Sequence, residues 1–187
     1  TTAATPRTAA LTIGGQTFNI SQAAGCTFTI SPTSLSVTSG ARTGTVAVSS
    51  AAGCAWTAAS SASWISVTSG ASGSGNGSVG YSIAANTTIT PRTGVVTIAG
   101  QAFTVTQDGI PCTSTISPTG VSLDAAVATG SIAVTIPAGC TWTATDNASW
   151  VSITSGASGT GNGTVGYSIT ANPNTTQRTA TISAAGQ

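Results

Sequence analysis

The sequence predicts an all-β protein built from tandem antiparallel β-sandwiches of about seven strands each. In short segments, Val, Ile and Thr alternate with small polar residues, which is typical of half-buried strands. Gly, Asn and Pro separate these segments, as expected for tight turns. A long internal repeat indicates an array of whole domains. Because no segment has a sustained apolar period of 3.6 residues, we expect no long helix.

The repeat sets the domain boundaries. The residues that return 86 positions later are Cys26 as Cys112, Cys54 as Cys140, Trp56 as Trp142, Trp64 as Trp150 and Tyr81 as Tyr167. Residues 26–111 therefore form repeat 1, and residues 112–187 form repeat 2. Residues 5–22 match residues 90–107, so we expect residues 1–25 to be the C-terminal strands of a preceding, partial repeat. Repeat 2 ends before the counterpart of AFTVTQ in repeat 1, so we expect it to lack its last strand.

Strand signals follow one another along repeat 1. The segments are Thr27–Ser31, Ser34–Thr38, Thr43–Ser49, Cys54–Ala58, Trp64–Val67, Ser78–Ala84, Arg92–Ile98 and Gln101–Gln107. Alternation is visible in pairs such as Val46 with Val48 and Phe103 with Val105, and Pro32 separates the first two segments. This spacing of short strands is typical of a sandwich.

A glycine motif within the repeat resembles a nucleotide-binding loop. GNGSVG at Gly75–Gly80, which returns as GNGTVG at Gly161–Gly166, fits the pattern G-x-G-x-x-G. A phosphate-binding loop of this kind opens a helix, but here the alternation of Val79, Tyr81 and Ile83 predicts a strand. We therefore expect no nucleotide cofactor, and we expect Asn76 and Gly77 to form a type I′ hairpin turn.

The four cysteines form two pairs with the same separation. We expect one disulfide in each repeat, Cys26–Cys54 and Cys112–Cys140, which would tie the first strand to the strand that carries the next tryptophan. The alternative is that these are buried free thiols. We do not expect zinc on this pattern, because two cysteines per repeat without histidine cannot supply four ligands. Disulfides would indicate an oxidising compartment outside the cytoplasm.

Composition excludes several classes of function. Only 4% of the residues are charged, compared with about 25% in a typical soluble domain. The few arginines form no basic cluster, so we expect no nucleic-acid partner, and no apolar run is long enough for membrane insertion. Lys, Glu and His are absent, and the three aspartates do not recur between the repeats. We therefore expect no enzymatic activity, no metal and no cofactor.

Each aromatic position has its own expected role. Trp56 and Trp142 follow a cysteine by two residues, so we expect them in the core beside the disulfide. Trp64 should point away from the face shared by Ile65 and Val67, which makes Trp64 and Trp150 candidates for stacking on glycans. We expect Tyr81 and Tyr167 to be packing residues.

Together these motifs resemble a known family. They run in the order C-x-[FS]-x-I-S-P, G-C-x-W-T-A, A-S-W-[IV]-S-[IV]-T-S-G, G-x-G-N-G-x-V-x-Y-S-I and R-T-x-x-x-x-I-x-G-Q. This order is similar to that of BACON domains, which are bacterial all-β modules found in tandem in secreted and surface proteins. The resemblance implies an immunoglobulin-like sandwich outside the cell. It also implies either carbohydrate or mucin binding or a spacer role.

Two functions are therefore expected from the sequence. The first is a non-enzymatic module of an extracellular bacterial surface stalk, fibre or filament, with neighbouring copies or adjacent repeats as partners. Strand addition between the unmatched ends would assemble such copies head-to-tail, but the favoured alternative is that the chain is a piece cut from a longer array. The second is a glycan-binding module that uses Trp64 and Trp150. Residues 1–15 do not resemble a secretory signal, so we expect a mature product or a fragment.

Overall fold

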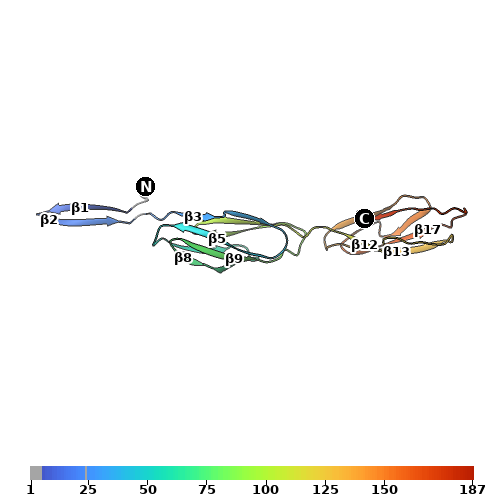
Figure 1. Cartoon of the computed structure of the whole chain (residues 1–187), viewed down its shortest axis with the longest axis horizontal. Helices are drawn as coiled ribbons and strands as arrows, with labels where there is room; N and C mark the ends of the chain where they lie inside the picture. The colour runs from blue at the N-terminus through green and yellow to red at the C-terminus, as the bar shows by residue number, and fades with distance from the viewer. Residues whose placement is uncertain (1–5, 24) are drawn as a thin grey trace. The chain divides into compact units, whose positions relative to one another are not determined.

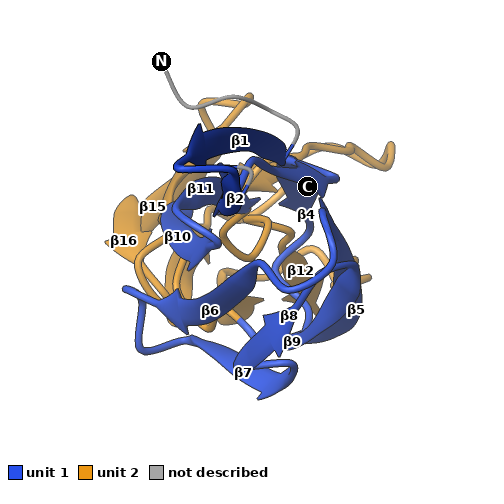
Figure 2. Ribbon diagram, turned by 90° about the vertical axis from the view of Figure 1, so that its left-hand side faces the viewer, with its two compact units in different colours: residues 1–85, 92–107 blue, residues 86–91, 108–187 orange. Residues whose placement is uncertain are grey.

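The computed structural model describes residues 6–23 and 25–187, and every regular element in these ranges is a β-strand. The chain divides into two compact units (Figure 2). Unit 1 contains residues 1–85 and 92–107, and unit 2 contains residues 86–91 and 108–187. The all-β prediction is confirmed. No described segment forms a helix that is long and apolar enough to cross a membrane.

Unit 1 contains a sandwich of two sheets (Figure 1). The five-stranded sheet has the order β4 (Ser34–Val37), β11 (Gln101–Gln107), β10 (Arg92–Ile98), β6 (Ala55–Ser60) and β8 (Ser72–Ser74). The four-stranded sheet has the order β3 (Phe28–Ser31), β5 (Arg42–Ser50), β9 (Gly77–Ile83) and β7 (Ile65–Ser69). Neighbouring strands are antiparallel except β4, which runs parallel to β11. The number of strands in this sandwich exceeds the expected seven for two reasons. One is the additional short strand β8, and the other is that β3 and β4 are separate strands in different sheets.

The core of unit 1 lies between these two sheets. Its side chains come from alternate positions of the strands, because successive residues of a strand point to opposite faces. The fully buried members are Val46, Val79, Val96, Ile98, Phe103 and Val105. The alternation seen in the sequence therefore identified the inward-facing positions correctly.

Unit 2 repeats most of this arrangement. One sheet has the order β12 (Thr115–Ser117), β13 (Ala128–Thr135), β17 (Gly163–Ile169) and β15 (Val151–Ser155). The other has the order β16 (Ser158–Thr160), β14 (Thr141–Asp146) and β18 (Ile182–Ala184). Among the described residues of unit 2, no strand pairs with the outer edge of β18, and residues 120–123, which correspond to β4, form no strand. In unit 1, β4 pairs only with β11. The absence of a strand at residues 120–123 is therefore consistent with the absence of a paired strand beside β18.

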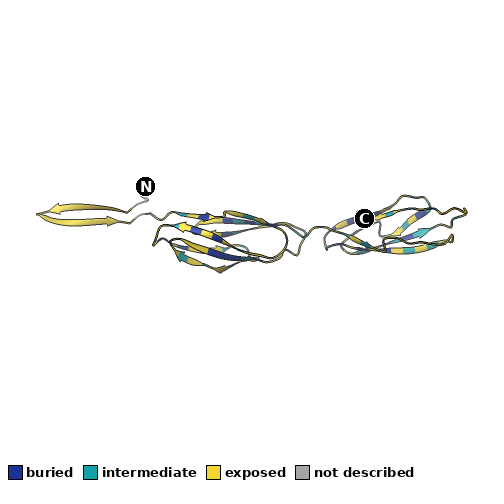
Figure 3. Cartoon of the chain, viewed as in Figure 1, coloured by how far each residue is buried: buried dark blue, intermediate teal, exposed yellow. Residues whose placement is uncertain are grey.

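The strands β1 (Arg7–Ile13) and β2 (Gln16–Gln22) form a two-stranded hairpin, which pairs with no other strand in the part of the chain that the structure describes. Its register matches that of β10 and β11, since Arg7 pairs with Gln22 as Arg92 pairs with Gln107. Every residue of both strands is exposed (Figure 3). Residues 1–5 and Ala24, which fall in the predicted partial repeat 1–25, lie outside the described residues.

The predicted type I′ turn at Asn76 and Gly77 is wrong. Neither residue has a positive φ; the left-handed residue is Gly75, with φ of 70°. The strands on either side, β8 and β9, lie in different sheets and do not pair. The segment after the glycine motif is nevertheless a strand, β9, so the motif does not open a helix.

Candidate functional site

The described residues form no cluster of metal-ligating side chains. In the ranges 6–23 and 25–187, no three His, Cys, Asp or Glu residues form a group that could hold a metal ion. The residues identified in the sequence belong instead to three kinds of feature. These are the disulfides, the surroundings of the tryptophans and an open groove in unit 2.

Both predicted disulfides are present. Cys26 bonds Cys54 and Cys112 bonds Cys140, with Cα–Cα distances of 5.5 and 5.6 Å. In unit 1, Cys26 precedes β3 in one sheet and Cys54 precedes β6 in the other. The bond therefore joins the two sheets at one end of the sandwich, and the alternative of free thiols is excluded.

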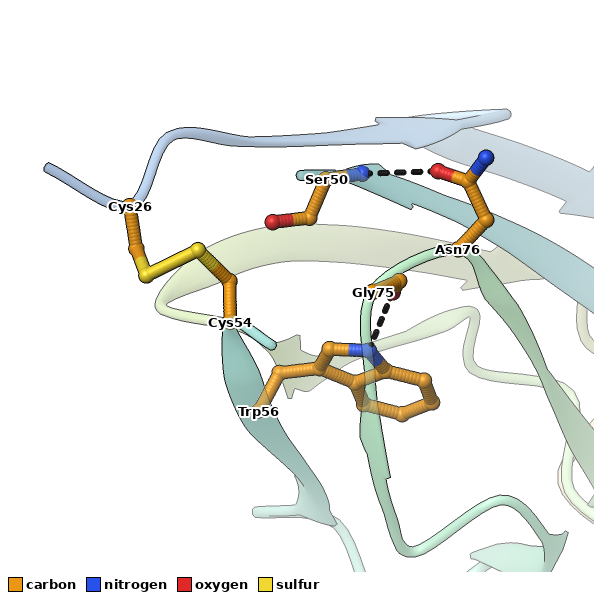
Figure 4. Close-up of a disulfide and its surroundings, with 6 residues drawn as sticks. All are labelled: Cys26, Ser50, Cys54, Trp56, Gly75 and Asn76. Atoms are coloured by element: carbon orange, nitrogen blue, oxygen red, sulfur yellow. Dashed lines mark hydrogen bonds between the residues drawn. A yellow bond between two sulfur atoms is a disulfide. The ribbon is translucent and has the colours of Figure 1, made fainter. Parts of the chain in front are cut away.

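The indole of Trp56 lies beside the glycine motif and is hydrogen-bonded to it (Figure 4). The Nε1 atom of Trp56 donates a 2.8 Å hydrogen bond to the carbonyl oxygen of Gly75. A Cβ atom on Gly73 or Gly77 would lie 2.3 or 2.5 Å from Cζ2 of the indole, so only glycine fits at these two positions. Asn76 completes the turn, because its Oδ1 accepts a 3.0 Å hydrogen bond from the backbone N–H of Ser50. The motif thus holds a tryptophan ring rather than a phosphate.

Unit 2 contains the same arrangement. Trp142 donates a 2.8 Å hydrogen bond from Nε1 to the carbonyl of Gly161. Its ring lies against Gly159 and Gly163, where a Cβ would come within 2.5 and 2.4 Å of Cζ2. Trp56 and Trp142 are each only 6% exposed, so the prediction that both are core residues is confirmed.

The Gly77→Ala variant is expected to lower the free energy of unfolding of unit 1 by about 1–3 kcal/mol, because the new methyl group overpacks the indole. Chemical denaturation followed by circular dichroism would measure the change. The matched control is Gly40→Ala, because Gly40 has open space around its Cα and no positive φ. We expect this control to change stability by less than about 0.5 kcal/mol. Equal stability of the two variants would contradict the packing role of the motif.

The predicted glycan-stacking residues are each covered on one face by an arginine of the same unit. The guanidinium carbon of Arg92 lies 4.3 Å from the ring centroid of Trp64, and that of Arg178 lies 4.2 Å from the centroid of Trp150. Both rings are half-buried. Cation–π contacts of this kind stabilise by about 0.5–2 kcal/mol. A sugar would therefore have only the remaining exposed part of each ring to stack on.

Sequence reasoning missed the polar anchor at the end of β11. Gln107 is fully buried, and its Nε2 donates to the carbonyl oxygens of Ser39, Gly40 and Ala84 at 3.0–3.2 Å. Its Oε1 accepts a 2.9 Å hydrogen bond from Nε of Arg92. The sequence did contain a signal for the arginine side of this contact. Three of the four arginines occupy the same position of the repeat, namely Arg7, Arg92 and Arg178.

Tyr81 is a buried packing residue, as expected. Its ring lies 5.2 Å from that of Phe103, and its hydroxyl covers Gly44, where a Cβ would come within 2.4 Å. Burial raises the pKa of the Tyr81 hydroxyl, and the charge of Arg42 lowers it in part. Tyr167 covers Gly130 in the same way in unit 2.

A groove of about 560 Å³ opens in unit 2 on the side where β11 lies in unit 1. Its lining includes Ile116, Trp150, Tyr167, Ile169 and Arg178. Tyr167 corresponds to Tyr81, which packs against Phe103 of β11 in unit 1. The groove is therefore the unit 2 counterpart of a site that a strand fills in unit 1.

Comparison with known proteins finds a family match in each of two successive parts of the chain. Residues 27–110 and 113–187 each match the family described as the viral BACON domain. A solved structure of a Bacteroides ovatus GH5 xyloglucanase in complex with a XXXG heptasaccharide is similar with 18% sequence identity and a TM-score of 0.41. The similarity covers 52% of this chain and 22% of that one. No curated protein matches the chain.

Proposed function

Because the chain belongs to the BACON family, with tandem domains at residues 27–110 and 113–187, we propose that it is a non-enzymatic structural module of an extracellular stalk, fibre or filament. Its repeats would act as stable, weakly charged building blocks. Their partners would be adjacent repeats or neighbouring copies of the chain.

The observation that supports this proposal is how the repeat uses its distinctive residues. Trp56 is held by glycines, the disulfide joins the two sheets, and Arg92 binds both Trp64 and Gln107. Each of these interactions lies inside one unit and strengthens it. A disulfide that closes a loop of this length contributes about 3–4 kcal/mol. The repeat therefore has the features of a module selected for stability.

Two further observations bear on location. The disulfides favour an oxidising environment outside the cytoplasm. The matched family is described as viral, so a virus particle is the first place to look for such a stalk, ahead of the bacterial surface expected from the sequence.

Immunogold electron microscopy with an antibody against unit 1 would test the structural role. We expect gold particles along stalks or filaments on virus particles or on the surface of the producing cell. Mass spectrometry of the protein isolated without reductant should show two disulfides. Label confined to the cytoplasm, with four reduced cysteines, would overturn the proposal.

Glycan binding is the second candidate, and the open groove of unit 2 favours it. Trp150 lines this groove together with Asn172, Asn174 and Arg178, so an aromatic ring and hydrogen-bonding groups face one space. This combination could hold a sugar, since amphipathic aromatic surfaces and a few polar groups make up most ligand sites.

Titration of tryptophan fluorescence with diverse polysaccharides and mucin would distinguish the two candidates. If the role is structural, we expect no saturable change in emission with any glycan. The Trp150→Phe variant is the probe of the groove, and the Trp64→Phe variant is its matched control in unit 1. A saturable response that Trp150→Phe abolishes and Trp64→Phe retains would favour glycan binding instead.

A further inference from the structure

We propose that unit 1 carries mechanical tension along the polypeptide, with β11 as the strand that resists the pull and the Cys26–Cys54 bond as a crosslink that limits extension. The inference rests on the structural role proposed above and adds a mechanical property to it. Three observations support it: the direction of the load relative to the strands, the contacts of β11, and the covalent path that the force takes.

Force would enter and leave unit 1 at opposite ends of its strands. The chain enters at Cys26, which is bonded to Cys54 just before β6. Ala58 of β6 pairs with Ile98, the last residue of β10, so β6 begins at the end of the sheet where a turn joins β10 to β11. The chain leaves after Gln107, the last residue of β11, at the opposite end. A pull through the chain therefore acts along the strands.

This direction loads the β-ladders in shear. The hydrogen bonds of an antiparallel ladder are perpendicular to its strands, so a pull along the strands stretches all of them at once. β11 is held on both edges, by antiparallel β10 and by parallel β4. Its side chains Phe103 and Val105 are fully buried, so sliding the strand would also remove them from the core. β11 must therefore slide past both neighbours together.

The residue at which the force leaves is anchored by its side chain. The end of a strand is ordinarily where pairing frays, but Gln107 is fully buried. Its Nε2 donates to the carbonyl oxygens of Ser39 and Gly40, which follow β4, and to that of Ala84, which follows β9 in the other sheet. One amide thus ties the loaded end of β11 to both sheets.

The disulfide determines which residues the force can extend (Figure 4). The covalent path runs from Cys26 across the sulfur–sulfur bond to Cys54, so it bypasses residues 27–53, which contain β3, β4 and β5. Since Cys26 precedes a strand of one sheet and Cys54 a strand of the other, the force reaches both sheets together. It cannot pull β4 away from β11 by the chain end that precedes β4.

Single-molecule force spectroscopy of the 187-residue chain tests the direction of resistance. Click-reactive amino acids at the exposed positions of Ala23 and Asp108 would attach the handles without using thiols, and they load unit 1 along its strands. A second pair at Pro91 and Asp108 loads the β10–β11 ladder at its open end, where its bonds break one at a time. We expect the first geometry to require a several-fold higher force at the same pulling speed.

The crosslink is tested in the Ala23 and Asp108 geometry with and without reductant. With the bond intact, unfolding should extend the chain only from Cys54 onward. Reduction should lengthen the extension by about 90 Å, because the 28 residue steps between Cys26 and Cys54 each extend by about 3.3–3.6 Å.

The anchor is tested by Gln107→Ala, which should lower the unfolding force along the strands. Its matched control is Gln101→Ala, at the exposed first residue of the same strand, which should leave the force unchanged. Val46→Ala separates mechanical from thermodynamic effects, because Val46 is fully buried but lies in the bypassed segment. It should lower stability in denaturant and yet lower the unfolding force less than Gln107→Ala does. Circular dichroism would establish that each variant is folded.

Three outcomes would overturn the inference. They are equal forces in the two pulling geometries, equal forces for Gln107→Ala and Gln101→Ala, and an extension that reductant does not change although mass spectrometry shows the bond. The first uses no variant of the core, so it holds even if Gln107→Ala does not fold. None of these results would remove the structural role, because a repeat can form part of a stalk that bears no tension. That role fails only in the immunogold and disulfide measurements.

Discussion

The Trp56→Ala variant is expected to lower the free energy of unfolding of unit 1 by about 3–5 kcal/mol. Three losses combine in this variant. The large buried ring is removed from the core, a cavity opens beside Gly73 and Gly77, and the carbonyl of Gly75 loses its 2.8 Å hydrogen bond. Urea denaturation followed by far-ultraviolet circular dichroism would show an early transition for unit 1.

Two further variants show which part of the effect belongs to the glycine motif. Trp64→Ala removes the same side chain from a half-buried position and should cost less. Trp142→Ala should cause the same loss in unit 2 and leave unit 1 unchanged, because Trp142 has the same partners there. A loss below about 1 kcal/mol for Trp56→Ala, which is the range of ordinary surface substitutions, would show that the indole does not organise this end of the sandwich.

Removal of the first disulfide is expected to lower the stability of unit 1 by about 3–4 kcal/mol in the chain-entropy treatment. The variant is Cys26→Ser with Cys54→Ser, which leaves the Cys112–Cys140 bond intact as an internal control. The unfolding midpoint of unit 1 should fall, and that of unit 2 should stay constant. In the unchanged protein, a reductant should lower both midpoints. Midpoints that do not respond to the reductant would show that the bonds do not stabilise the folded units.

Much of the fold could be predicted from the sequence because its signals are local or repeated. The alternation at Val46 and Val48 and at Phe103 and Val105 marked the inward faces of β5 and β11. The cysteine spacing gave both disulfides. These predictions needed only the geometry of a strand and the recurrence of the motif.

Other features depend on contacts between distant residues. The turn rule for Asn76 and Gly77 assumes that the flanking strands pair with each other, but β8 and β9 belong to different sheets. The glycines are there because an indole from Trp56 lies against them. No local pattern around the glycine motif reveals that partner.

The candidate site was only partly predictable for the same reason. The alternation of the strand predicted only that Trp64 points away from the face of Ile65. It could not predict that a guanidinium covers the ring, because that group comes from Arg92 on another sheet. The recurring arginine marks the position of Arg92, which binds Gln107. A polar residue at the end of a strand nevertheless looks the same in the sequence whether it is solvated or buried, so the three backbone acceptors of Gln107 could not be identified from it. Its significance emerges only when its partners are located in space.

The exposure of the β1–β2 hairpin also makes it a target for proteases, which cleave most readily where the backbone is accessible. Cleavage within the hairpin would leave the Cys26–Cys54 bond and the two sheets between β3 and β11 intact. Limited proteolysis followed by mass spectrometry is therefore expected to remove residues from this end of the chain before either sandwich is degraded.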